Sequence, residues 1–257
     1  MSTPELEFHV ILDPTLTEAP EGAFLYEGDL LGFYHSLISG HAYPLTLATR
    51  SLEDVDTLLA LAIFMHRDLA IHPGTPGLIA SFMLACAEPF WGLAHIDRDL
   101  ARLILHIRVY LTHANGDLHQ QGDRLASALQ WIHEYATQGF LPQMAPAAPP
   151  PRVLLTGTDG FVLAETKGPR DMGWVELFRM GFFRGALVGQ PKNDRRPVTI
   201  ARKTSLIQFD LERAAQALNA MELAMGEEPA WVVEENFLRS PGTLVLMEHL
   251  MLLLTRV

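Results

Sequence analysis

Two aspartates, Asp54 and Asp56, have the spacing in this sequence that most directly suggests chemistry. They lie within residues 44–65, where an apolar strand-like run is followed by a polar turn and a helical pattern. Carboxylates at the carboxyl end of a strand point into the crevice where α/β sheets bind ligands. Two carboxylates so close repel each other, and a divalent cation such as Mn²⁺ or Mg²⁺ relieves that repulsion. The alternative is that both acids only complement the dipole of the helix that they open.

A second group of metal-ligand types lies at residues 94–99, and a third candidate lies near the N-terminus. His95 and Asp97 are two positions apart and could supply nitrogen and oxygen ligands to Mn²⁺ or Zn²⁺. The alternative is that Asp97 or Asp99 caps a helix beginning near residue 98, with His95 as a half-buried loop residue. Asp13 follows the first strand-like run, and its alternative role is an Asx-turn before Pro14.

Candidate anion-binding residues lie in the second half of the chain. Arg202 and Lys203 follow an apolar run, and Arg239 and Ser240 open an Arg-Ser-Pro-Gly-Thr stretch rich in hydroxyl and backbone donors. Both pairs could orient a phosphate. The alternative is that these basic side chains are only solvated.

The first 142 residues predict short strands followed by helices. The expected strands are at 8–12, 23–26 and 45–49, and the expected helices are at about 52–65, 75–87, 98–113 and 123–138. Thr49 or Ser51 is the expected cap of the first helix. The helix at 75–87 is apolar almost all round, which predicts that it is buried. The pattern indicates an α/β layered domain with a largely parallel sheet.

Residues 152–257 predict a smaller α+β domain. A hairpin is expected at 152–156 and 161–165 across Gly157-Thr-Asp-Gly160, and a second hairpin at 186–188 and 197–201. Helices are expected at 174–182, at 211–221 with Asp210 as cap, and at 245–254. The last of these is apolar enough to pack on its own sheet or on another subunit.

A proline-rich stretch at residues 143–151 divides these two parts, because consecutive prolines favour an extended spacer. The charge changes at the same place. Residues 1–144 hold six Arg, no Lys and seventeen Asp or Glu, and ten of the eleven histidines, whereas the rest of the chain is balanced. We therefore predict an acidic, His-rich domain at 1–142, a linker at 143–151 and a second domain at 152–257.

The composition excludes several classes of protein. An acidic first domain is a poor partner for duplex DNA, which needs a basic surface. Cys86 is the only cysteine, so no intramolecular disulfide forms, and we expect a buried thiol. No apolar run approaches the roughly 20 residues that span a bilayer, and the N-terminus lacks an apolar signal core. We expect a cytoplasmic protein that has no membrane partner.

The segment with Asp-x-Asp-x-x-x-Ala at 54–60 resembles the first motif of the DHH phosphoesterases. The order of an α/β domain, a linker and a smaller C-terminal domain is similar to that family, and residues 173–189, 196–204 and 209–219 resemble parts of its associated C-terminal domain. The resemblance implies that Asp54 and Asp56, with His95, Asp97 or Asp13, hold Mn²⁺ or Mg²⁺. It also implies that Arg202, Lys203, Arg239 and Ser240 bind the substrate.

Two departures from the family pattern leave a second reading open. Arg50 stands where the motif has a histidine, and the Asp-His-His triplet is absent from the sequence. Arg50 could steady a phosphate in place of holding a metal. The sequence therefore predicts a divergent metal-dependent phosphoesterase for a small nucleotide or a short single-stranded oligonucleotide. The alternative is a non-catalytic binding or assembly protein on a decayed scaffold, forming a homo-oligomer.

Overall fold

The computed structural model describes residues 9–12, 15–19, 21–39, 46–49, 54–87, 90–112, 118–139, 148–157, 160–182, 184–191, 195–202, 210–234, 237–245 and 250. Two compact units make up the chain, Met1–Ala145 and Pro146–Val257. They are called the N-terminal unit and the C-terminal unit below. Their boundary falls inside the proline-rich stretch. Both units combine helices and strands, which confirms a mixed α and β protein.

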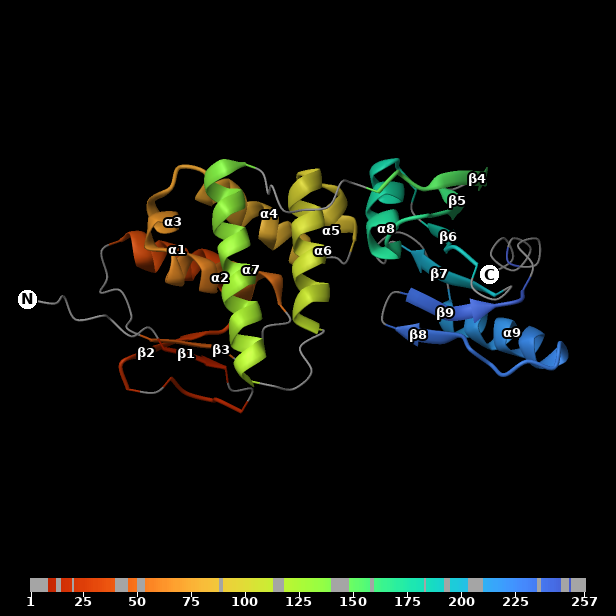
Figure 1. Cartoon of the computed structure of the whole chain (residues 1–257), viewed down its shortest axis with the longest axis horizontal. Helices are drawn as coiled ribbons and strands as arrows, with labels where there is room; N and C mark the ends of the chain where they lie inside the picture. Colours follow the sequence, from red (N-terminus) through yellow and green to blue (C-terminus); the bar gives the residue numbers. More distant parts are fainter. Residues whose placement is uncertain are drawn as a thin grey trace, which may run out of the picture. The chain divides into compact units, whose positions relative to one another are not determined.

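The N-terminal unit has a short sheet and a larger group of helices (Figure 1). The strands are β1 (His9–Leu12), β2 (Ala23–Tyr26) and β3 (Thr46–Thr49), in the order β1-β3-β2 with both pairings parallel. The helices are α1 (Leu30–Ile38), α2 (Val55–Met65), α3 (Arg67–Ile71), α4 (Thr75–Ala87), α5 (Trp91–Ala94), α6 (Arg98–Thr112) and α7 (Leu118–Gln138).

Helix α2 is the centre of this unit. It packs against α1, α3, α4, α7 and β3, and nearly all of its side chains from Val55 to Phe64 are buried. A helix that is apolar on every side is stable only when neighbours cover it on every side. From the sequence, the helix at 75–87 was expected to be the buried one. This expectation was wrong in part. Helix α4 has the expected ends but exposes Met83 and Leu84.

The C-terminal unit is built on one sheet of six strands in the order β4-β5-β6-β7-β9-β8. Its elements are β4 (Arg152–Thr156), β5 (Phe161–Glu165), α8 (Arg170–Arg179), β6 (Arg184–Val188), β7 (Arg196–Arg202), α9 (Leu211–Ala224), β8 (Val232–Glu234) and β9 (Phe237–Thr243). All pairings are antiparallel except that of β5 with β6. The exception follows from α8, which is the crossover between these two strands. Both expected hairpins, β4–β5 and β6–β7, are confirmed.

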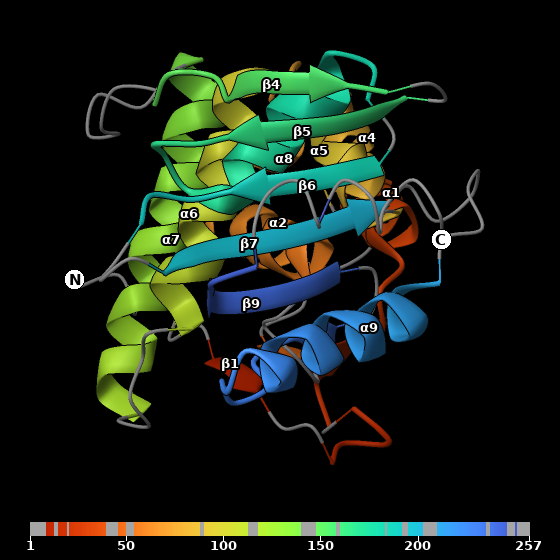
Figure 2. The same cartoon turned by 90° about the vertical axis from the view of Figure 1, so that its right-hand side faces the viewer.

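Helices α8 and α9 cover opposite faces of the sheet (Figure 2). Alternate strand residues point to opposite faces, so Ala186 and Val188 belong to the core under α9. Leu187 instead faces α8. A Cβ on Gly173 would lie 2.7 Å from the Cδ2 atom of Leu187, so this glycine allows α8 to approach the sheet closely.

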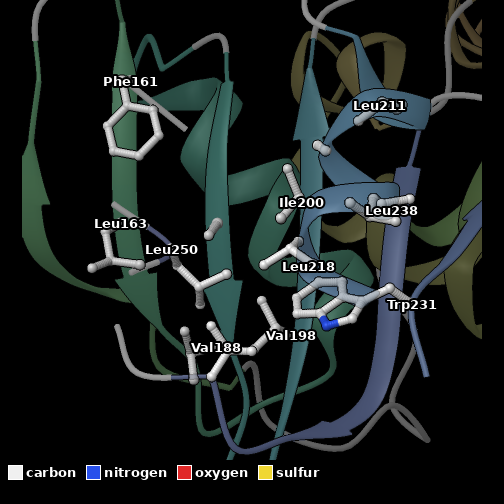
Figure 3. Close-up of a cluster of buried hydrophobic side chains, with 14 residues drawn as sticks. Phe161, Leu163, Val188, Val198, Ile200, Leu211, Leu218, Trp231, Leu238 and Leu250 are labelled. Carbon is white, nitrogen blue, oxygen red and sulfur yellow. The ribbon is translucent and has the colours of Figure 1, made fainter. Parts of the chain in front are cut away.

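The core beneath α9 also takes in the C-terminal part of the chain (Figure 3). Leu211 and Leu218 of α9 pack with Leu250, which is fully buried, and with Val245. Leu250 is therefore part of the unit's own core and is not available to a second subunit. The rest of the helix expected at 245–254 lies outside the described residues.

Candidate metal centre

Asp54 and Asp56 occupy the start of α2 as expected, but their surroundings differ. Asp54 is the N-cap residue of α2, its side chain is exposed, and it makes no capping hydrogen bond. The helix thus begins later than expected, with Asp54 and not Thr49 at its N-cap position, and Ser51 lies outside the described residues. Asp56 accepts a hydrogen bond from the Tyr26 hydroxyl at 2.7 Å, and the Cys86 thiol lies 3.8 Å from its other oxygen. Asp56 therefore has an established role in joining α2 to β2.

These contacts also decide the protonation of Tyr26 and Cys86. Burial, followed by the hydrogen bond to Asp56, raises the pKa of Tyr26 well above its usual range, so its hydroxyl stays a donor. Partial desolvation of the Cys86 thiol, followed by the nearby Asp56 charge, likewise raises the pKa of Cys86. Cys86 is exposed, and the expectation of a buried thiol was wrong, yet its raised pKa disfavours the reactive thiolate.

Asp97 takes the capping role that the sequence left open, whereas His95 is not half-buried as its alternative required. Asp97 accepts hydrogen bonds from the backbone nitrogens of Asp99 at 2.9 Å and Leu100 at 3.1 Å, and so caps α6. The Tyr135 hydroxyl also donates to it at 2.8 Å. Burial alone would raise the pKa of Asp97, but these hydrogen bonds outweigh it and lower the pKa. His95 is exposed, with its ring 4.7 Å from that of Trp91.

The structure does not gather these expected ligands into one site. Within the described residues, no group of three or more metal-ligand atoms lying within 4.8 Å of one another includes Asp54, Asp56, His95 or Asp97. Asp13 and Arg50 lie outside the described residues. The paired aspartates therefore lack a third ligand in the part of the chain that the structure describes.

Of the expected anion-binding residues, Arg239 is paired and Ser240 is enclosed. Arg239 lies in strand β9, not in a loop, and pairs with Glu234 at 3.2 Å and Asp171 at 3.8 Å. Two carboxylates therefore offset its charge. Ser240, the next residue of β9, is fully buried. Arg202 ends β7 with its side chain outside the described residues, and Lys203 lies outside them altogether.

A different trio, His66, Asp68 and His133, has ligand atoms close enough together to hold a metal ion. One ligand atom from each residue lies within 4.8 Å of those of the other two. The Nε2 atom of His133 is 2.7 Å from Oδ2 of Asp68, and the rings of His66 and His133 stack with centroids 4.4 Å apart. It is the only such group among the residues that the structure describes.

Three separate elements bring this trio together. His66 is the single residue between α2 and α3, Asp68 lies in the first turn of α3, and His133 projects from α7. Helix α7 packs against both α2 and α3. Sequence reasoning missed the site because only the His66-x-Asp68 spacing is visible locally. The third ligand comes from a helix much later in the chain.

The pKa values of His66 and Asp68 are both lowered, which favours the forms that bind a cation. Burial, reinforced by the nearby His133, lowers the pKa of His66, although the Asp68 charge opposes this. His66 therefore stays neutral with a free lone pair at physiological pH. The hydrogen bond with His133 lowers the pKa of Asp68, so the carboxylate is ionised. Two imidazoles and one carboxylate form a donor set suited to Zn²⁺ or Mn²⁺.

The centre is open on one side. The Asp68 side chain is 63% exposed, whereas that of His133 is 21% exposed. If these three residues held a cation, they would leave a coordination position for water, as in catalytic rather than structural metal sites. Nε2 of His133 faces the Asp68 carboxylate, and this nitrogen must be free of its proton before it can bind a cation.

No family model, curated protein or solved structure matches the chain. No helix among the described residues is long and apolar enough to span a membrane.

Proposed function

We propose that the N-terminal unit is a metal-dependent hydrolase that holds Zn²⁺ or Mn²⁺ at His66, Asp68 and His133. The observation that carries the proposal is the convergence of two imidazoles and one carboxylate from three elements. The imidazoles favour a borderline-soft transition metal over Mg²⁺, which prefers oxygen ligands alone. The proposed metal site therefore uses residues other than the paired aspartates.

The chemistry of such a centre is the activation of water. A cation with an open position lowers the pKa of bound water towards neutrality and polarises the bond to be cleaved. His66, Asp68 and His133 would hold the ion, and the exposed side of Asp68 leaves room for a substrate. The protein's contribution is the fixed spacing of these three groups.

The substrate class comes from the resemblance to the DHH phosphoesterases at residues 54–60. We therefore propose a phosphoester of a small nucleotide or short oligonucleotide as the substrate. His66 directly follows the helix that carries this resemblance. A metal at its carboxyl end would be a departure from the family's pattern, in line with the absent Asp-His-His triplet.

Metal titration monitored by thermal melting tests the proposal. A ligand present at 100 times its Kd adds about 2.7 kcal/mol to the free energy of unfolding. We expect Zn²⁺ or Mn²⁺ to raise the melting temperature of the wild type and not of His133→Ala. The matched control is His95→Ala, which removes an exposed imidazole of the same unit and should keep the full shift. Equal shifts in all three proteins would refute the centre.

Turnover separates a hydrolase from a metal-binding protein without activity. The metal-loaded wild type should cleave a generic nitrophenyl phosphodiester, and His133→Ala should lose at least tenfold of that rate. The second candidate function is a non-catalytic binding or assembly protein. It is favoured by the two carboxylates that pair with Arg239, which leave this arginine poorly suited to bind a substrate phosphate. Metal binding without turnover on phosphomonoesters or phosphodiesters would support this second function.

A further inference from the structure

The outer edge of β4 is unpaired in the part of the chain that the structure describes. Strand β4 lies at one end of the six-stranded sheet and pairs with β5 on its inner side alone (Figure 2). An unpaired strand edge presents a row of backbone N–H and C=O groups that can accept another strand. Natural proteins protect such edges with charges, prolines or short length.

β4 lacks side-chain protection along most of its length. All five of its residues are exposed, including Val153 at 37%, Leu154 at 41% and Leu155 at 45%. Its only charged residue is Arg152, at the first position. In contrast, its neighbour β5 buries Phe161 to Ala164. Three successive aliphatic residues on an exposed edge are a surface suited to contact with another apolar strand.

The opposite edge of the sheet is different. Strand β8 has three residues and ends in Glu234, which pairs with Arg239 at 3.2 Å. A short strand that ends in a charge is a poor template for further pairing. The sheet therefore has one open edge and one protected edge.

We propose that β4 pairs antiparallel with β4 of a second copy of this chain, about a two-fold axis at Leu154. The sequence Arg-Val-Leu-Leu-Thr complements itself in that arrangement. Leu154 faces Leu154 of the second copy, Val153 faces Leu155, and Arg152 faces Thr156. Cross-strand apolar pairs stabilise a sheet, and like charges placed opposite each other destabilise it.

The position of Arg152 favours antiparallel pairing and a second copy of this chain as the partner. In the antiparallel pair the two Arg152 side chains lie at opposite ends, whereas an in-register parallel pair would place them side by side. The stretch 153–156 has no charged group for recognising a charged partner. A two-fold contact also closes on itself, so the assembly stops at a dimer.

A bulge limits the strength of this contact. The register between β4 and β5 shifts between Val153 and Leu155. A bulge twists the strand, so the flat run available for pairing is short. The contact would be smaller than the roughly 1,200–2,000 Å² of a stable interface. The dimer should therefore form reversibly and only as the protein concentration rises.

Sedimentation velocity over a wide range of protein concentrations tests the dimer. The wild type should pass from monomer to dimer, and Leu155→Lys should raise the midpoint concentration at least tenfold. The control Val232→Lys places the same charge at an exposed position on β8, the opposite edge, and should leave the midpoint unchanged. A wild type that stays monomeric throughout, or a dimer lost in Val232→Lys and kept in Leu155→Lys, overturns the proposal.

Cysteine crosslinking tests the two-fold axis and does not rely on a destabilising charge. Cys86→Ser yields a cysteine-free chain, because Cys86 is the only cysteine. In that background, Leu154→Cys should form a disulfide-linked dimer on mild oxidation, since facing residues of antiparallel strands are within disulfide reach. Val232→Cys should form no disulfide-linked dimer. Crosslinking of Val232→Cys without crosslinking of Leu154→Cys would contradict pairing through β4.

Discussion

The Nε2 atom of His133 lies 2.7 Å from Oδ2 of Asp68, although 65 positions separate the two residues. This contact joins α7 to the first turn of α3, and His66 stacks on the His133 ring at 4.4 Å. The hydrogen bond lowers the pKa of Asp68, and burial lowers the pKa of His66. Both shifts favour the protonation states that bind a cation.

The lowered pKa of His66 predicts a specific dependence of stability on pH. The unfolded chain protonates His66 at its ordinary pKa of about 6.5, whereas the folded chain resists protonation. Between the two pKa values the unfolded state binds more protons, so the free energy of unfolding falls as the pH decreases. Urea unfolding of the metal-free protein from about pH 8 to about pH 5 should show the wild type losing more stability than His66→Asn.

The matched control for this titration is His95→Asn, which removes an exposed imidazole. It should follow the wild-type pH profile. If His66→Asn followed the wild-type profile too, His66 would not be the group responsible.

Asp97 should act as a cap and not as a metal ligand. Asp97→Ala removes the hydrogen bonds to the start of α6 and leaves the Tyr135 hydroxyl without its acceptor. We expect a loss of about 1–2 kcal/mol in the free energy of unfolding, measured in urea, with unchanged metal affinity. Asp99→Ala, which removes an exposed pair with Arg102, should cost less than about 1 kcal/mol. A lower metal affinity in Asp97→Ala would restore Asp97 as a ligand.

Replacing Asp56 should lower the stability of the protein more than replacing Asp54. Asp56→Ala leaves the buried Tyr26 hydroxyl without its acceptor and should cost about 1–3 kcal/mol of stability. Asp54→Ala should cost little, because the Asp54 side chain makes no capping hydrogen bond. Thermal melting with and without Zn²⁺ measures both quantities. Loss of the metal-induced shift in either variant would return the metal to the paired aspartates.

Glu222 should be a stabilising residue of the C-terminal unit. Its buried carboxylate accepts from the Ala230 backbone nitrogen at 2.9 Å and from Nε1 of Trp231 at 3.1 Å. Glu222→Ala leaves two donors unpaired and should lower the free energy of unfolding by about 2–4 kcal/mol, measured by Trp fluorescence in urea. The exposed neighbour Glu228 is the control, and Glu228→Ala should change stability by less than about 0.5 kcal/mol.

The sequence predicted those helices and strands that have a strong hydrophobic periodicity and clear cap or turn residues at their ends. Helix α4 has the expected ends, and Asp210 caps α9 by accepting from the Arg213 backbone nitrogen at 2.9 Å. Strand β9 was missed because Ser240, Pro241 and Gly242 are typical of a turn. Tertiary pairing with β7 and β8 holds this segment extended despite its composition.

The candidate metal centre could not be predicted because its ligands are not neighbours in the sequence. His66 and Asp68 gave a two-residue signal with no third partner in view. Their proximity to His133 depends on α7 packing across both α2 and α3. The acidic pair at Asp54 and Asp56 had the stronger local signal, but a local signal does not show which side chains meet in space.

Nuclear magnetic resonance of the histidine rings during Zn²⁺ addition tests the metal centre most directly. With one equivalent of Zn²⁺, the ring nitrogen signals of His66 and His133 should shift together, and those of His95 should stay in place. Asp54→Asn/Asp56→Asn should give the same spectrum as the wild type. A shift at His95 that leaves His66 and His133 unchanged would contradict the centre at His66, Asp68 and His133.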